Sequence, residues 1–241
     1  MSAKQEELTT IIQQGAECLG ISLPLGASRA FYEYYNLLEE KGKNVNLTAI
    51  SGAAEVARLH FLDSIGLLTI SEFTNAKVID IGSGAGFPGI PLKIAEPTIE
   101  LTLLDSSKKR VNFLEEVCQK LSIDAKCIHN RAEEHAREPN FREHWDIAVS
   151  RALAKLNILA ELCLPLVRIG GTFLAMKSIN MQNELSDSMN AIELLGGRFI
   201  EKVDYKIPGT DIMHSAVIIQ KIGKTSDRYP RRFSRIQASP L

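Results

Sequence analysis

Short apolar runs that alternate with helical segments after Val78 constrain the fold most. Two more strand-like runs, RFIEKVDYKI and HSAVIIQKI, have only PGTDIM between them, which is too short for a helical crossover, so we expect them to pair antiparallel. The alternation predicts a mostly parallel α/β sheet with helices on both faces and an antiparallel last strand. The five alternating strand-like runs are residues 78–81, 101–105, 125–129, 146–150 and 171–176.

The same pattern divides the 241 residues into three parts. Residues 1–70 have apolar side chains at helical spacing and are predicted to form an N-terminal helical lid. Residues 71–221 hold the α/β domain, and residues 222–241 form a basic tail. From Lys221 onward the chain has six Lys or Arg side chains against one Asp, a net charge of +5.

Composition excludes several classes of protein. A net charge of −1 excludes a uniformly basic nucleic-acid binder but allows a local basic patch. The four cysteines form no C-x-x-C pair and the five histidines lack zinc-type spacing, so we expect reduced thiols and no metal site. The first residues, MSAKQEELTT, are polar and no run of 18 apolar residues occurs, which predicts a cytoplasmic protein without membrane contact.

The run VIDIGSGAGFPGIPL places a glycine-rich loop directly after the first strand. Gly84, Gly86 and Gly89 match the G-x-G-x-x-G pattern of dinucleotide sites. Counted from Gly82, the first glycine after the strand, the pattern is instead G-x-G-x-G, and Phe87 stands where the third dinucleotide glycine belongs. The register therefore argues against a dinucleotide.

Two acids at strand ends narrow the choice of ligand. Asp80 lies two residues before Gly82, where we expect it to face the ligand, repelling a pyrophosphate and attracting a cation. Because S-adenosylmethionine carries an ammonium and a sulfonium and no phosphate, charge favours it over NAD. Asp105 ends the second strand, a place where acids accept hydrogen bonds from a ribose diol in both nucleotide folds. The alternative is that Asp105 caps the next helix, which Ser106 and Ser107 open.

Three further positions follow later strands. Ala132 and Glu133 in NRAEE lie beside the expected adenine pocket, although Glu133 equally suits the first turn of a helix. Arg151 ends the fourth strand, where it either faces the ligand or lies exposed at the start of the next helix.

Other candidates are weaker. Lys177, at a strand end, either contacts the substrate or is simply solvated. Asn46, in NVNLT, either lines the pocket or caps the next helix. Arg228, Arg231 and Arg232 in the tail suit phosphate contacts, although terminal charge runs often only solvate a chain.

The segments IDIGSGAGFPGIPL, LLDSSKKRVNFL, NRAEE, SRALA, NLT and RYPRR together resemble the RsmG (GidB) family of bacterial 16S ribosomal RNA guanine-N7 methyltransferases, over nearly the whole chain. The resemblance implies a class I methyltransferase fold. It also implies that Gly82 and Phe87 line the donor site, that Ala132 and Glu133 contact adenosine, and that Arg151 completes the pocket. Family tails usually continue past YPR with a Gly-Thr-Pro-like run, whereas FSRIQASPL follows here.

These observations predict methyl transfer from S-adenosylmethionine to N7 of one guanine in 16S ribosomal RNA, by a monomer acting on the small ribosomal subunit. Guanine N7 carries its own lone pair, so alignment supplies most of the rate and no general base is needed. We therefore name no catalytic residue, and keep Arg151, Lys177 and Asn46 as positioning candidates. Arg151 could donate to guanine O6, or bind the donor carboxylate or an RNA phosphate. We favour a donor or phosphate contact, because a cation near N7 opposes the positive charge that the product ring gains. The predicted donor-site residues are Asp80, Gly82, Gly84, Gly86, Phe87, Asp105, Ala132, Glu133 and Arg151. The alternatives are an NAD-dependent oxidoreductase and a non-catalytic ribosome-assembly factor.

Overall fold

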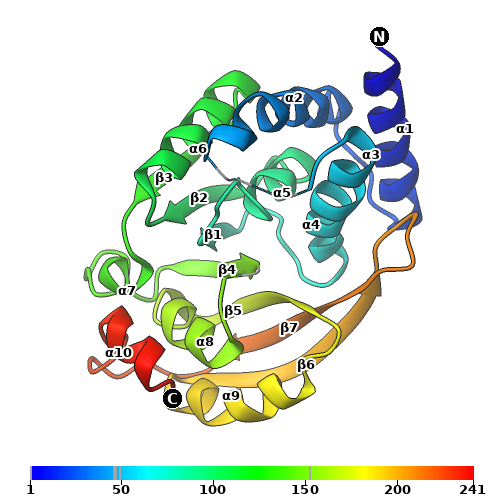
Figure 1. Cartoon of the computed structure of the whole chain (residues 1–241). Coiled ribbons are helices and arrows are strands. Elements are labelled where there is room, and N and C mark those ends of the chain that lie inside the picture. The colour runs from blue at the N-terminus through cyan, green and yellow to red at the C-terminus, as the bar shows by residue number, and fades with distance from the viewer. Residues whose placement is uncertain (1, 46–47, 49, 152) are drawn as a thin grey trace.

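The structure, a computed structural model, describes residues 2–45, 48, 50–151 and 153–241. Its strands form one sheet in the order β3-β2-β1-β4-β5-β7-β6 (Figure 1). β1 pairs in parallel with β2 and β4, whereas β7 is antiparallel to both β5 and β6. The predicted mostly parallel sheet and antiparallel final hairpin are confirmed. The strands are β1 (Lys77–Ile81), β2 (Glu100–Asp105), β3 (Ala125–His129), β4 (Trp145–Arg151), β5 (Val167–Ser178), β6 (Gly197–Lys206) and β7 (Met213–Lys221).

Helices cover both faces of this sheet, as the alternation of elements requires (Figure 1). One face carries α1 (Ala3–Cys18), α2 (Ala27–Val45), α3 (Ala53–Val56), η1 (Ala57–Leu62), α4 (Asp63–Ile65), η2 (Gly66–Thr69), α5 (Gly89–Ala95) and α6 (Lys108–Leu121). The other carries α7 (Ala132–His135), α8 (Leu156–Cys163), α9 (Gln182–Leu194) and α10 (Phe233–Ala238). No helix in the described part of the chain is long and apolar enough to cross a membrane.

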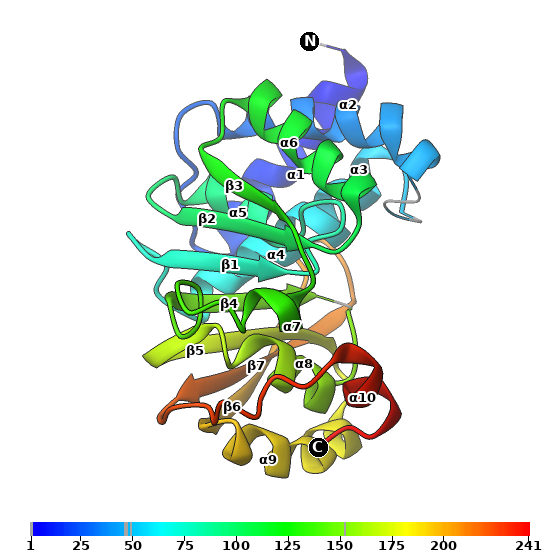
Figure 2. The same ribbon diagram turned by 90° about the vertical axis from the view of Figure 1, so that its left-hand side faces the viewer.

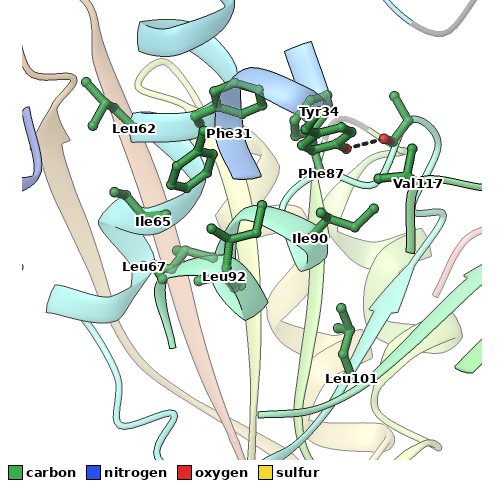
Figure 3. Packing of buried hydrophobic residues seen from close by; sticks show 14 of the residues in the cluster. Phe31, Tyr34, Leu62, Ile65, Leu67, Phe87, Ile90, Leu92, Leu101 and Val117 are labelled. Carbon is green, nitrogen blue, oxygen red and sulfur yellow. Dashed lines mark hydrogen bonds between the residues drawn. The ribbon is translucent and has the colours of Figure 1, made fainter. Parts of the chain in front are cut away.

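The N-terminal helices share one hydrophobic core with the sheet. Figure 3 shows Phe31 and Tyr34 of α2 and Ile65 of α4 directed toward Ile90 of α5, above Leu101 of β2. All five side chains belong to one cluster of buried residues. The segment predicted as a helical lid is therefore a layer of this core and covers one face of the sheet.

Two cations near the C-terminus face inward, Lys221 at the end of β7 and Arg231 in the C-terminal segment (residues 222–241). Lys221 is fully buried, lies 3.1 Å from Glu143, and has its pKa lowered to about 8 by burial. Arg231 makes a bidentate ion pair with Glu161 of α8, which is also fully buried, at distances down to 2.6 Å. Two of the six cations from Lys221 onward, Lys221 and Arg231, are therefore paired inside the protein. Composition counts charges and cannot show which of them are paired.

Further contacts dock this segment against α7 and α8, beside which it lies in Figure 2. Arg142 donates to the carbonyls of Tyr229, at 2.9 Å, and Thr225, at 2.8 Å. Arg137 donates to the carbonyl of Pro230, and Ile236 of α10 is fully buried. The C-terminal segment is thus an integral part of the fold.

The Arg231–Glu161 pair gives a test of this docking. The variant Arg231→Ala leaves a buried carboxylate without its cation, so we expect the free energy of unfolding to fall by about 3–5 kcal/mol. The exposed neighbour provides the matched control, because Arg232→Ala should change it by no more than about 0.5 kcal/mol. Urea unfolding measures both. Equal stabilities of the two variants would contradict the assigned pair.

Candidate active site

A cavity of about 280 Å³ opens at the carboxyl ends of β1, β2 and β3. Gly82, Asp105, Ala132 and Glu133, all predicted as donor-site residues, line it together. They come together because the carboxyl ends of parallel strands meet at one edge of a sheet. A larger cavity of about 570 Å³ lies between α1 and the start of α2 and is lined by none of the predicted site residues.

The glycine loop is shaped by close contacts. Gly82 and Gly86 have φ values of 71° and 101°, a region that side chains disfavour. A Cβ on Gly86 would lie 2.5 Å from Ile90 Cδ1, and one on Gly82 would lie 2.7 Å from Leu153 at the cavity. Tyr34 donates to the carbonyl of Ala85, as the dashed line in Figure 3 shows. A bulkier loop would therefore collide with α5 on one side and close the cavity on the other.

Asp80 does not face the cavity as predicted, but is fully buried beneath the loop. Side chains alternate along a strand, and Asp80 shares the face of Val78, which α5 covers. Its Oδ2 accepts from Gly89 N at 2.9 Å, and its Oδ1 has no partner among the described residues. Burial raises the pKa of this carboxyl to about 7. The direct ligand contact expected of Asp80 is replaced by support of the loop.

Asp105 lines the cavity and also bonds to the backbone on both sides of it. Its Oδ2 accepts from Gly84 N at 2.9 Å, and its Oδ1 accepts from Ser107 N at 2.8 Å, just before α6. Arg110 of α6 lies 3.6 Å from Oδ2. Asp105 therefore does bond to the backbone just before α6, close to the capping role considered for it. Its contact with a ribose stays a prediction.

Glu133 lies in the first turn of α7, where its carboxylate is buried. Its Oε1 accepts from Arg131 Nε at 2.6 Å. The Arg131 guanidinium lies over the ring of Phe233, 4.9 Å from its centroid. Both of the open interpretations of Glu133, helix turn and pocket wall, fit this position.

Arg151 lies away from the cavity, in a polar cluster beneath the N-terminal helices. Its Nη1 donates to the carbonyl of Leu59 at 3.2 Å and to Asp63 at 3.3 Å, and its Nη2 donates to His60 Nδ1 at 3.0 Å. The guanidinium also covers Phe87, 4.8 Å from the ring centroid. Neither Arg151 nor Phe87 is among the residues that line the cavity, so the structure does not place them in the pocket that the resemblance implied.

Asp63 is the centre of this polar cluster. Tyr205 Oη donates to its Oδ1 at 2.9 Å, and His214 Nδ1 lies 2.8 Å from the same atom. The bond to Asp63 raises the pKa of His214, whereas burial and the charge of Arg151 lower the pKa of His60 to about 3. His60 and Asp63 are linked to each other through Arg151. Sequence reasoning missed Tyr205 and His214, which face each other across the β6–β7 pair and which β7 places beside β5.

The remaining candidates are either engaged by other protein groups, exposed to solvent, or outside the described residues. Lys177 donates to the carbonyl of Ala154 and pairs with Glu184, so it holds the segment after β4. Asn46 lies outside the described residues. Arg228 and Arg232 are exposed, whereas Arg231 is bound by Glu161 and is not free for the phosphate contact predicted for it.

A family model described as rRNA small subunit methyltransferase G (GidB) matches residues 27–206. Ribosomal RNA small subunit methyltransferase G of Thermoanaerobacter sp. (strain X514) is 45% identical over 230 residues, which cover 95% of this chain and 96% of that protein. The protein of the same name from Acetivibrio thermocellus is 40% identical over 242 residues and covers 100% of both chains.

Solved structures resemble the fold at low sequence identity. TrmN from Thermus thermophilus has a TM-score of 0.51 at 14% identity, covering 67% of this chain and 48% of that one. The Methanococcus jannaschii fibrillarin pre-rRNA processing protein has a TM-score of 0.50 at 14% identity, covering 64% and 70%. At this identity the likeness concerns the fold alone.

The buried carboxyl of Asp80 predicts a dependence of stability on pH. Its folded pKa is raised, so the stability it contributes is present below the unfolded pKa of 3.8 and is lost as pH rises through about 7. The variant Asp80→Asn cannot ionise, while its amide oxygen can still accept from Gly89 N. We expect the free energy of unfolding of the variant, relative to wild type, to rise by an amount on the order of a few kcal/mol across that interval. Denaturant titrations at several pH values measure this difference, and a constant difference would contradict the prediction.

Proposed function

The chain belongs to the GidB family of ribosomal RNA small subunit methyltransferases, and from this premise we propose that it transfers a methyl group from S-adenosylmethionine to N7 of one guanine in 16S ribosomal RNA. The observation that carries the proposal is the cavity at the carboxyl ends of β1, β2 and β3. Four residues predicted for the donor, Gly82, Asp105, Ala132 and Glu133, line it.

The chemistry of the cavity suits this donor. The nearby cations are already paired, Arg131 with Glu133 at 2.6 Å and Arg110 with Asp105 at 3.6 Å, which leaves little positive charge for a pyrophosphate. In the proposed complex Asp105 holds the ribose diol, Ala132 and Glu133 contact the base, and the backbone at Gly82 lies along the amino-acid end. When bound, the donor supplies an electrophilic methyl group.

The acceptor requires positioning and no proton removal, because guanine N7 carries a free lone pair. Of the three positioning candidates, Lys177 is engaged by Glu184 and Asn46 lies outside the described residues. Arg151 ends β4, which neighbours β1 in the sheet, and Leu59, His60 and Asp63 fix its guanidinium. The Arg151 side chain is still 16% exposed, and we propose that this exposed part contacts the donor carboxylate or an RNA phosphate, the contacts favoured from the sequence.

The exposed arginines Arg228 and Arg232 support contact with RNA phosphates. They belong to the docked C-terminal segment, which also contributes Phe233 to the wall of the cavity. We further propose that the protein acts as a monomer, in the cytoplasm, on the small ribosomal subunit.

Labelled S-adenosylmethionine and small subunits that lack the modification test this function. We expect label in the RNA, together with chemical cleavage at one N7-methylguanosine. The variant Asp105→Ala should lose most of the label because donor binding weakens, whereas the exposed-acid control Asp124→Ala should keep it. Label without that cleavage would contradict the N7 assignment. Donor binding without label would favour the non-catalytic assembly factor.

The tail arginines predict a salt-dependent contribution to subunit binding. The double variant Arg228→Ala/Arg232→Ala should weaken binding and reduce the slope of log K against log salt by about 1.5, since each lost phosphate contact removes roughly 0.7–0.9. Two exposed arginines elsewhere, in Arg29→Ala/Arg198→Ala, provide the matched control. Filter binding across a salt series measures both slopes. Equal slopes would remove these arginines from the interface.

A further inference from the structure

The C-terminal segment supplies one wall of the donor cavity. Phe233, the first residue of α10, lines it together with Asp105, Arg131 and Glu133. Among the described residues that line this cavity, Phe233 is the only aromatic one. It lies about a hundred residues after the other three in the chain, so the cavity is complete only when the C-terminal segment is docked.

Phe233 is held in place from several directions. The Arg131 guanidinium lies 4.9 Å from its ring centroid, a favourable cation–π arrangement. Before it in the chain, Arg231 is locked to the buried Glu161, and after it Ile236 is fully buried in the core. The ring therefore has a fixed place in the wall before any ligand binds, which limits the entropy lost on binding.

The sheet order shows which end of the donor this wall faces. In the order β3-β2-β1-β4, the loop at Gly82 follows β1, Asp105 ends β2, and Arg131 follows β3. A donor whose ribose lies at Asp105 therefore has its sulfur toward Gly82 and its base toward the end of β3. Phe233 contacts Arg131, and so lies at the base end.

The two faces of an adenine ring are apolar and bind best against an apolar surface. An aromatic side chain supplies such a surface by stacking, which does not depend on hydrogen bonds to the base. At the base end, Ser106 and Asn130 offer small polar side chains, whereas Phe233 offers a ring. We propose that Phe233 is an adenine-binding residue and that donor affinity depends on the docked C-terminal segment. This inference rests on the proposed function, because it takes an adenosyl donor as the ligand. It also gives a role to the FSRIQASPL ending, which departs from the usual family run.

Calorimetric titration of the full chain with S-adenosylhomocysteine and with adenosine tests the inference. We expect Phe233→Ala to raise Kd about tenfold for both ligands, the scale of one base–aromatic contact, because both carry the adenine. Phe233→Tyr keeps the ring and should stay within about twofold of wild type. The matched control is Phe199→Ala, which removes a half-buried phenyl ring on β6, away from the cavity, and should leave Kd unchanged.

Phe233→Leu separates a binding role from a merely structural one, because it keeps apolar volume in the wall while removing the ring. It should unfold at a denaturant concentration near that of wild type and still bind both ligands several-fold more weakly. Wild-type affinity in Phe233→Ala or Phe233→Leu would overturn the inference and leave the proposed function intact. A wild-type chain that binds neither ligand would overturn the proposed function itself, and the inference with it.

Discussion

Two carboxylates hold the glycine loop, and the rest of the site depends on them. Asp80 accepts from Gly89 N below the loop, and Asp105 accepts from Gly84 N above it, each at 2.9 Å. The first bond ties the start of α5, where the loop ends, to β1, and the second ties the loop itself to the end of β2. Gly82, which lies between Asp80 and Gly84 in the chain, borders the cavity. Burial raises the pKa of Asp80, which shows that its charged form is destabilised inside the protein. This free-energy cost accompanies a loop whose geometry is fixed before a ligand binds.

The same loop separates two environments at the carboxyl edge of the sheet. On one face the cavity is bordered by Asp105, the start of α7 and the docked C-terminal segment. On the other face lies the polar cluster in which Asp63 binds Arg151, Tyr205 and His214. Methyl transfer requires the acceptor atom, the methyl carbon and the sulfur of the donor to lie on one line. This arrangement allows the first face to hold the donor and the second to position the RNA, so that alignment supplies the catalysis.

Local sequence patterns predicted the strands, the glycine loop and four residues of the cavity wall. Those four could be found because each lies at or shortly after the carboxyl end of a strand, and the ends of parallel strands meet at one edge. Asp80 was expected to face the ligand and instead points away from the cavity, because its face is set by strand alternation beneath α5. Partners distant in the chain were also missed, since neither spacing nor composition encodes them. These are the pairs Arg231–Glu161 and Lys221–Glu143, and the place of Phe233 in the wall.

The central claim is that this cavity binds an adenosyl methyl donor and not a dinucleotide, although the loop also contains a literal G-x-G-x-x-G. Parallel calorimetric titrations of the purified chain with S-adenosylhomocysteine and with NADH test it most directly. We expect saturable binding of S-adenosylhomocysteine at one site per chain, lost in Asp105→Ala, and no measurable binding of NADH. Saturable binding of NADH, with none of S-adenosylhomocysteine, would show that the cavity is a dinucleotide site.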